Sequence, residues 1–262
     1  MKAPVCHVSV ASARVVKAPV LSACVSSAGT GSVSVPEIKP HPLLLDFWTF
    51  SKGDNTDESR DRIVGLNNHI LRAYNFLWSP LSGYGHPDYP AGMAFDGIDD
   101  YLESEEGIFP ESDYTVLAKV TPFTKSYDNS IFSTKDFNAG NSGWNILSYE
   151  EKNGVLLFGN RVYQKSGRFA DMSGKTKLLA MARSGKTITL YQDMEPVGRV
   201  ELPEGTPNHK TYYLGVKRGL GGSFFRGMLH CNAVYAGALP PGEIHRQAQE
   251  AFPFYESLII NR

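Results

Sequence analysis

The sequence predicts an all-β fold, an antiparallel sandwich of two sheets, and three observations lead to this prediction. Many short segments between residues 114 and 235 alternate apolar and polar side chains, as half-buried strands do. Turn pairs such as Asn153-Gly154 separate these segments. The one convincing helix is short and late, at 241–251, so no helices interleave with the strands.

The composition allows one large domain and excludes several partners. Of the 262 residues, 42% are hydrophobic, which is enough for a core, and 25 glycines and 16 prolines favour turns over long helices. The formal net charge is −1, so the basic surface that nucleic-acid binding requires is not expected. No apolar run approaches the roughly 18 residues of a membrane helix. We expect no nucleic acid and no membrane, and a neutral ligand such as a sugar or another protein.

Residues 1–40 differ from the rest and form a separate arm ahead of a domain at 41–262. The arm is rich in Ala, Val, Ser and Pro and has no aromatic residue, and its Lys2–Val5 motif recurs at Lys17–Val20. One interpretation is a disordered tail. The other is an extended β-arm that becomes ordered by pairing with another subunit or a partner protein. The valine content favours the second interpretation, an anchoring or oligomerisation arm.

The N-terminal residues and the cysteines indicate a reducing compartment. The first residues resemble the start of a signal peptide, but polar residues such as His7 and Arg14 interrupt any continuous apolar segment. The three cysteines, Cys6, Cys24 and Cys231, lack metal-ligand spacing and leave an odd thiol, so they imply no disulfide framework. We expect the protein to fold in a reducing cytoplasm.

The globular part begins with a buried strand at 43–50, which is an almost continuous apolar run. A charged loop follows at 51–62. Its Asp54, Asn55 and Asp57 could hold a cation, but the later glycine and bidentate glutamate of an EF-hand are missing. A solvated loop is therefore the favoured interpretation.

Aromatic residues cluster between residues 71 and 90, among glycines and prolines. Tyr74 and Phe76 stand in an apolar run, and we expect them in the core. Trp78, Tyr84 and Tyr89 are candidates for a ligand-binding surface, because a pyranose presents an apolar CH face to an aromatic ring. The same rings could instead cover a sheet edge.

The stretch Phe95–Leu102 separates these aromatic loops from the regular strands. Asp96-Gly97 between apolar residues predicts a hairpin, since Asp tolerates and Gly supplies positive φ. Asp99 and Asp100 then place adjacent carboxylates on opposite faces of the next strand. Further strands are expected at 114–120, 130–133, 144–149, 155–158, 177–183, 187–192, 199–202, 212–216 and 224–235.

Four segments carry a resemblance to the laminin-G-like branch of the concanavalin A-like jelly rolls, over about residues 43–252. The stretch 93–102 resembles that family's Phe-Asp-Gly-x-Asp-Asp-Tyr motif, and 114–120 resembles its next strand. Residues 187–193 resemble its x-Leu-Tyr-x-Asp-Gly hairpin, although Met194 replaces the usual Gly, and Cys231 stands where an acid is common. Residues 213–215, 225–227 and 238–244 resemble the family's closing strands and terminal helix. Segments 65–68 and 82–85 are similar to versions common in proteins of gut Bacteroidetes and their phages.

The resemblance implies a jelly-roll sandwich and offers one metal site. Some members of the family bind Ca²⁺ through acids at the rim, and Asp96, Asp99 and Asp100 are the candidates in this sequence. The alternative is structural: Asp96 makes the turn while Asp99 or Asp100 accepts backbone N–H bonds. The structural role is favoured, because a hairpin alone supplies too few of the six to eight oxygens that calcium takes. Otherwise no cofactor is expected.

An enzyme is not expected, and no catalytic residues are assigned. The family's glucanases carry Glu-x-Asp-x-x-Glu on one strand, a pair of carboxylates as glycoside hydrolysis needs. That run is missing, and the acids at 99–106 have the wrong spacing. No nucleophile elbow, phosphate loop or zinc motif is present either. A glycoside hydrolase is thus the least favoured function.

The arm and the missing signal peptide favour a structural role in a phage virion. The hypothesis is a head-fibre, tail-fibre or capsid-decoration subunit, assembled in the host cytoplasm. Residues 1–40 would attach to other virion proteins, and the lectin-like sandwich would face a host-surface glycan. A homotrimer is expected by analogy with such fibres. The alternative is a bacterial carbohydrate-binding module or adhesin, at the cell surface or secreted.

Overall fold

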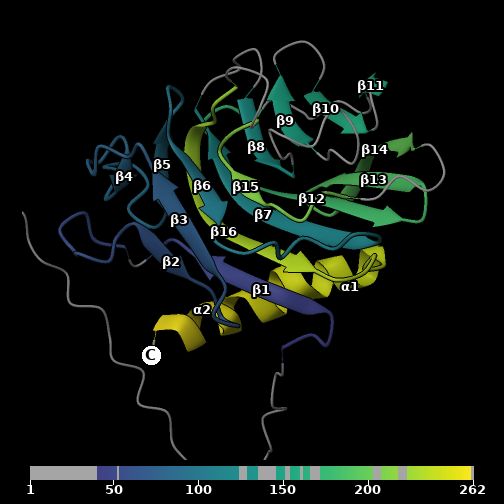
Figure 1. Ribbon diagram of the computed structural model, residues 1–262, viewed down its shortest axis with the longest axis horizontal. Helices are drawn as coiled ribbons and strands as arrows, with labels where there is room; N and C mark the ends of the chain where they lie inside the picture. Colours follow the sequence, from purple (N-terminus) through teal and green to yellow (C-terminus); the bar gives the residue numbers. More distant parts are fainter. Residues whose placement is uncertain are drawn as a thin grey trace, which may run out of the picture. The chain divides into compact units, whose positions relative to one another are not determined.

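The fold is described from a computed structural model, for residues 40–51, 53–123, 129–134, 146–150, 154–159, 162–165, 172–202, 208–217 and 223–260. The predicted arm lies outside this part of the chain, apart from its last residue. The described residues form two sheets of eight strands each, and every strand pairing is antiparallel (Figure 1). The predicted antiparallel two-sheet sandwich is confirmed.

Sheet A has the order β14-β13-β12-β7-β16-β5-β4, and β1 also pairs with β16. The long β16 therefore carries β7 on one side and both β5 and β1 on the other. The strands of sheet A are β1 (Leu44–Thr49), β4 (Gly83–Tyr84), β5 (Met93–Asp96), β7 (Tyr114–Pro122), β12 (Lys177–Ser184), β13 (Thr187–Gln192), β14 (Glu195–Glu201) and β16 (Arg226–Tyr235).

Sheet B has the order β11-β10-β9-β8-β15-β6-β3-β2. Its strands are β2 (Arg62–Val64), β3 (Ile70–Tyr74), β6 (Tyr101–Ser104), β8 (Asn129–Ser133), β9 (Ile146–Glu150), β10 (Gly154–Gly159), β11 (Val162–Lys165) and β15 (Tyr213–Leu214). The short strands β2, β3 and β11 have no counterpart among the expected strands. They are too brief, at three to five residues, to show a clear alternation.

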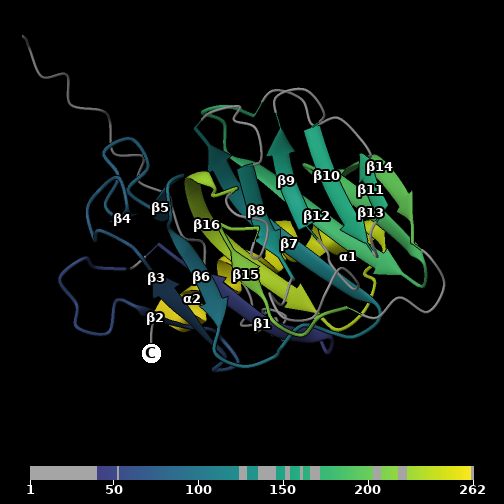
Figure 2. The same ribbon diagram turned by 45° about the horizontal axis from the view of Figure 1, so that its top comes forward.

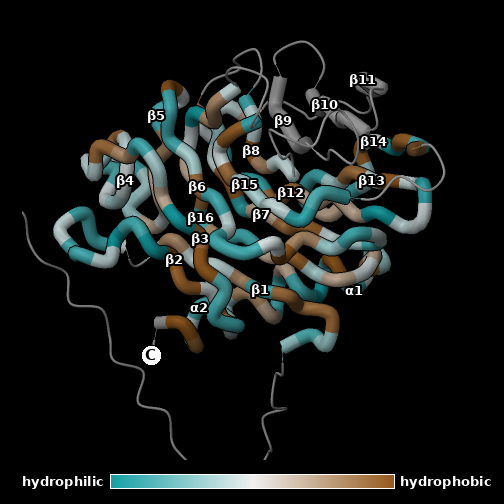
Figure 3. The backbone as a smooth tube through the Cα atoms, in the orientation of Figure 1, coloured by the Kyte–Doolittle hydropathy of each residue, from teal (hydrophilic) through white to brown (hydrophobic). Residues whose placement is uncertain are grey.

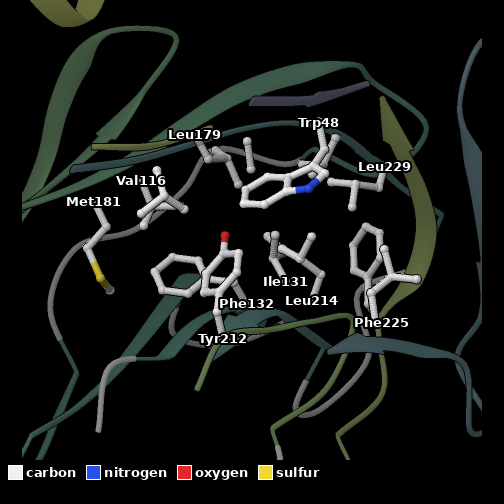
Figure 4. Close-up of a cluster of buried hydrophobic side chains, with 14 of the residues drawn as sticks. Trp48, Val116, Ile131, Phe132, Leu179, Met181, Tyr212, Leu214, Phe225 and Leu229 are labelled. Carbon is white, nitrogen blue, oxygen red and sulfur yellow. The ribbon is translucent and has the colours of Figure 1, made fainter. Parts of the chain in front are cut away.

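The main core lies between the two sheets. Figure 4 shows Trp48 and Leu229 of sheet A pointing toward Ile131 and Leu214 of sheet B, and all four side chains are at most 1% exposed. One polar link crosses this core: the Tyr212 hydroxyl donates to Asn232 Oδ1 at 2.9 Å. This bond satisfies the buried Tyr212 hydroxyl and the buried Asn232 amide oxygen.

A helical segment forms a third layer on the outer face of sheet A, on the side away from sheet B (Figure 2). It consists of α1 (Pro241–Arg246), a π-helical turn (Gln247–Ala251) and α2 (Phe252–Ile260). The rings of Phe47 and Phe252 lie 4.9 Å apart, and Tyr255 packs on the same Phe47. This apolar contact extends the helical segment past Ala251, where the sequence predicts its end. The π turn ends two residues before Pro253, which lacks an N–H in any case.

The expected hairpin at Phe95–Leu102 is wrong. Strand β5 pairs with β16 and β4 in sheet A, whereas β6 pairs with β15 and β3 in sheet B. The Asp96-Gly97 turn is real, with Gly97 at φ +80°, but it carries the chain from one sheet to the other. Local turn chemistry predicts a reversal and does not determine which sheet the next strand joins.

Candidate functional site

The corner between β5 and β6 gathers the three predicted acids. Carboxylate oxygens of Asp96, Asp99 and Asp100 all lie within 4.8 Å of one another. Asp99 is exposed, Asp96 is half-buried and Asp100 is fully buried. The expectation that Asp99 and Asp100 lie on opposite faces of the next strand is wrong, because both precede the first residue of β6 and their carboxylates lie close together.

Hydrogen bonds explain the arrangement of these acids. Asp96 Oδ1 accepts the backbone N–H of Ile98 at 2.7 Å, which closes the turn. Asp100 Oδ2 accepts the N–H of Asp96 at 2.9 Å, and its Oδ1 accepts the hydroxyl of Ser82 at 3.0 Å. Burial raises the pKa of Asp100 to about 7; the Asp96 N–H opposes this shift, and repulsion from the Asp96 and Asp99 carboxylates adds to it.

Calcium does not fit this corner well. An ion of this kind takes six to eight oxygen ligands. Both oxygens of Asp100 and one of Asp96 already hold hydrogen bonds, which leaves the second oxygen of Asp96 and the carboxylate of Asp99. The hydrogen bonds favour the turn-holding role, and calcium binding by these acids stays a prediction.

Trp78 occupies an unusual backbone conformation beside the acid corner. Its φ is +53°, in the left-handed region that bulky residues rarely adopt. Such strain costs about 1–3 kcal/mol and often marks a functional position. The indole is half-buried and stacks on Phe76, with ring centroids 5.4 Å apart, so one part of it is held by the core. The strained backbone makes Trp78 a candidate functional residue.

An open depression of about 460 Å³ lies against this indole, lined by Glu58, Arg60, Asp61 and Trp78. We call it the Trp78 depression. The Arg60 guanidinium lies over the indole, 5.3 Å from its centroid. Asp61 Oδ2 accepts from Arg72 Nη1 at 2.9 Å, and this bond raises the pKa of Arg72. The depression thus combines one aromatic ring with carboxylate acceptors and a guanidinium donor.

Exposed aliphatic side chains flank Trp78 on its own loop. Leu77 is 76% exposed and Leu81 is 64% exposed, and both precede β4, where Figure 3 shows brown hydrophobic segments. The Leu77 N–H donates to Ser82 Oγ, which in turn donates to Asp100. The loop is therefore fastened to the acid corner while its apolar side chains face outward. Apolar residues grouped on a loop mark an interaction surface more often than single ones do.

The charged loop at 51–62 holds the Trp78 loop in place. Asn55 Nδ2 donates to the Tyr84 carbonyl, and Asn55 Oδ1 accepts the Tyr84 N–H, both at 2.8 Å. Asp54 and Asp57 accept N–H bonds from Thr56 and Ser59, two residues further on. These acids build tight turns, so residues 54–59 are ordered. The repeated Asp-x-Ser/Thr spacing was the sequence pattern that could have predicted this order, and with it the role of Glu58 and Arg60.

The three aromatic candidates occupy different places. Trp78 faces the depression, but Tyr84 is only 7% exposed, so its placement on a binding surface is wrong: it packs behind Trp78, with centroids 6.2 Å apart. Tyr89 is half-buried elsewhere, stacked on Phe123, and its hydroxyl donates to the Gly174 carbonyl at 3.0 Å. Of the two expected core residues, Phe76 is buried as predicted, whereas Tyr74 is 38% exposed, which corrects that prediction.

Comparison with known proteins places the chain in a family. Residues 96–245, more than half of the chain, match the sequence profile described as the concanavalin A-like lectin/glucanases superfamily, of the laminin-G type. The chain belongs to this superfamily, and the resemblance predicted from the Phe95–Leu102 stretch is confirmed. No curated protein matches the sequence.

Solved structures share the same fold. Domain 4 of AbnA, a GH43 extracellular arabinanase from Geobacillus stearothermophilus in complex with arabinotriose, has a TM-score of 0.55 and 16% identity, covering 79% of this chain and 98% of that one. Trypanosoma rangeli sialidase in complex with sialic acid has a TM-score of 0.58 and 16% identity, covering 79% of this chain and 33% of that one. The binding domain of botulinum neurotoxin serotype D/C has a TM-score of 0.54 and 14% identity, covering 82% and 52%.

At such identities the likeness concerns the fold alone. The chain spans about a third of the sialidase and about half of the toxin chain. It is a lectin-like jelly-roll domain. Among the described residues, none of the helices has the length and apolar character needed to cross a bilayer.

Proposed function

We propose that the protein is a non-catalytic carbohydrate-binding protein whose sugar site is the Trp78 depression. The observation that carries the proposal is the indole of Trp78, held half-exposed at φ +53° beside an open depression. An aromatic ring accepts the apolar CH face of a pyranose, and the carboxylates of Glu58 and Asp61 would accept its hydroxyl hydrogens. The Arg60 guanidinium, which lies over the indole, would turn aside to free the ring and donate to a ring or glycosidic oxygen.

The site geometry supports binding over chemistry. Hydrolysis of a glycoside needs one carboxyl group that is protonated and one that is ionised. Among the described carboxyl groups, Asp100 has a pKa raised to about 7, but it is fully buried and bonded to Ser82. Asp61 is already paired with Arg72. The depression is therefore suited to holding a sugar, with no acid–base pair placed across it.

A glycan array tests the proposal. We expect the wild type to bind a subset of glycans, and Trp78→Ala to lose at least about tenfold in affinity, because ring stacking contributes about 0.5–1.5 kcal/mol beyond the area buried. Tyr74→Ala is the matched control, since Tyr74 is an exposed aromatic that stacks on Tyr101 outside the depression. Binding should not depend on EDTA. An array without any bound glycan, or equal loss in both variants, would refute the proposal.

The finer proposal is that this protein belongs to a phage virion, as a head-fibre, tail-fibre or capsid-decoration subunit. Its support is the composition of residues 1–40, valine-rich and without aromatic residues, which suits an arm that pairs with other virion proteins or with two further copies of the chain. Mass spectrometry of purified virions should detect the protein. Its absence there would favour the alternative of a bacterial surface adhesin or carbohydrate-binding module.

The arm makes a second, separate prediction about assembly. Light scattering after size exclusion should give an oligomer for the full chain, with a trimer expected, and a monomer for residues 41–262. If both proteins are monomers, the oligomerisation role of the arm is wrong, while the sugar site at Trp78 is unaffected.

A further inference from the structure

A second pocket lies on the outer face of sheet A, next to the helical segment and separate from the Trp78 depression. Its volume is about 300 Å³, at the small end for ligand sites. Phe252 and Leu178 form an apolar floor, and Lys119, Thr176, His230 and Glu256 contribute polar groups. Strands β7, β12 and β16 supply one wall and α2 supplies the other.

A β-bulge places His230 in this pocket. In the pairing of β16 with β7, Leu229 opposes Val120 and Cys231 opposes Lys119, so His230 is the extra residue. Bulges re-aim a side chain, and this one puts both His230 and Cys231 on the outer face. Gly92 makes room for the imidazole, since a Cβ there would come within 3.0 Å of His230 Nδ1. The bulge therefore turns the His230 imidazole toward the pocket.

A chain of hydrogen bonds from His230 through Thr121 to Thr176 determines which of these groups can accept a hydrogen bond in the pocket. His230 Nδ1 lies 2.5 Å from the Ala91 carbonyl, which can only accept, so Nδ1 carries the hydrogen. Burial lowers the pKa of His230, so the ring is neutral and Nε2 accepts from Thr121 Oγ1 at 2.8 Å. Thr121 then accepts from Thr176, also at 2.8 Å. The hydroxyl oxygen of Thr176 is left as an acceptor toward the pocket.

Lys119 and the group that binds Glu256 lie in one row of paired residues across sheet A. Leu178, Lys119, Cys231 and Thr49 are successive partners on β12, β7, β16 and β1. Within the described part of the chain, Lys119 forms no ion pair, and it is exposed. At the other end, Glu256 Oε1 accepts from Thr49 at 3.0 Å and from Ser51 at 2.5 Å. Two strand spacings, roughly 10 Å, separate the backbones of Lys119 and Thr49.

Neighbouring groups do not neutralise Lys119. The other lysine of the pocket, Lys177, is paired with Asp193 at 2.5 Å. Burial raises the pKa of the Cys231 thiol to about 12, so this thiol is neither an anion nor a nucleophile. The pocket thus offers a free cation at one end, hydrogen-bond acceptors in the middle and at the far end, and an apolar floor.

We propose that this pocket binds an acidic monosaccharide, with its carboxylate on Lys119, its hydroxyls on Thr176 and Glu256, and its CH face on Phe252. A carboxylate matches the one unpaired ammonium group. The hydroxyl groups of the sugar would donate to Thr176, whose own hydrogen is bonded to Thr121, and to the Glu256 carboxylate. The residues that line this pocket differ from those of the Trp78 depression, so each of the two proposals can be refuted without the other.

Calorimetric titration of the full chain with D-glucuronate tests the proposal. We expect saturable binding in the millimolar range, at least about tenfold weaker in Lys119→Met and in Thr176→Val, because each loses one hydrogen bond with a charged or fixed partner. Lys186→Met is the control for charge, since Lys186 lies at the opposite end of β12. Lys186→Met should bind glucuronate as the wild type does. Trp78→Ala removes the other proposed sugar site, and in that background Lys119→Met should still weaken glucuronate binding at least about tenfold.

Two further probes identify the chemistry that is recognised. D-glucose lacks the carboxylate and acetate lacks the hydroxyls, and both should bind at least about tenfold more weakly than glucuronate. Glucose binding as tightly would remove the role of Lys119, and acetate binding as tightly would reduce the pocket to a bare anion site. Either result, absence of saturable binding, or unchanged binding in Lys119→Met overturns the proposal.

Discussion

Replacing Asp100 by Asn tests whether the corner between the sheets holds a neutral carboxyl group. Asp100 is fully buried, and its two contacts are the Asp96 N–H and the Ser82 hydroxyl. A protonated Asp100 keeps both, because a hydroxyl donates or accepts, so Ser82 Oγ can receive the carboxyl hydrogen. An asparagine reproduces this pattern, with its oxygen on Asp96 N–H and its amide donating to Ser82. We expect Asp100→Asn to fold.

The magnitude follows from the pKa of Asp100, about 7 in the folded protein against an ordinary value of 3.8. Between these values the folded state binds more protons than the unfolded state, so the free energy of unfolding falls as pH rises. The stabilisation is complete below about pH 4 and is lost as pH rises through 7. At about 1.4 kcal/mol for each pH unit, the contribution of Asp100 falls by about 2–3 kcal/mol between pH 5 and pH 8.

Urea unfolding of wild type and Asp100→Asn from pH 5 to pH 8 measures this difference. Other groups with shifted pKa values, including Asp46 and His230, titrate in both proteins and cancel in the comparison. Relative to the variant, the wild type should lose about 2–3 kcal/mol of unfolding free energy over this range. Parallel pH profiles for the two proteins would show that Asp100 ionises like an exposed acid, and the argument from burial would be refuted.

Three further predictions concern the parts that surround the sites. Phe252→Ala should lower the free energy of unfolding by about 3–5 kcal/mol, measured by urea titration, because it removes the ring that packs on Phe47. Gly65→Ala should lower it by about 1–3 kcal/mol, since the added Cβ would come within 2.4 Å of the buried Asp46 carboxylate; an unchanged midpoint would contradict that close approach. Calcium should leave the thermal transition at pH 8 unchanged, and a rise that Asp100→Asn abolishes would instead support a metal site.

The sequence predicted the strands where alternation is clear. Strand β13 spans Thr187–Gln192, the range expected from its alternating Thr, Ile and Leu residues, and β7 starts at the expected Tyr114. In both, one face packs into the core between the sheets and the other faces the helical segment or solvent. Period-two patterning is decided by the residues of the strand itself, so it can be seen without knowing the partner strand.

The buried acid in the first strand could not be predicted in the same way. Asp46 is fully buried and accepts backbone N–H bonds from Phe47, Asn67 and His69. Burial raises its pKa, and these donors oppose the shift. Asn67 and His69 are 21 and 23 residues away, and the close approach of Gly65 to the carboxylate leaves room for these contacts. The sequence distinguishes the 65–68 segment only by its resemblance, and the contact with Asp46 gives its physical role.

The two candidate binding sites show why function is harder to predict than fold. Trp78 is one aromatic residue among several in its loop, and the sequence does not show that Asn55 holds the backbone of the buried Tyr84, which stacks on Trp78. His230 faces its pocket because of a bulge, which breaks the alternation that sequence patterns rely on. In both cases the deciding contact joins segments that are distant along the chain or departs from regular geometry. A regular sandwich can therefore be predicted from local patterns, while the two candidate binding sites lie where those patterns are interrupted.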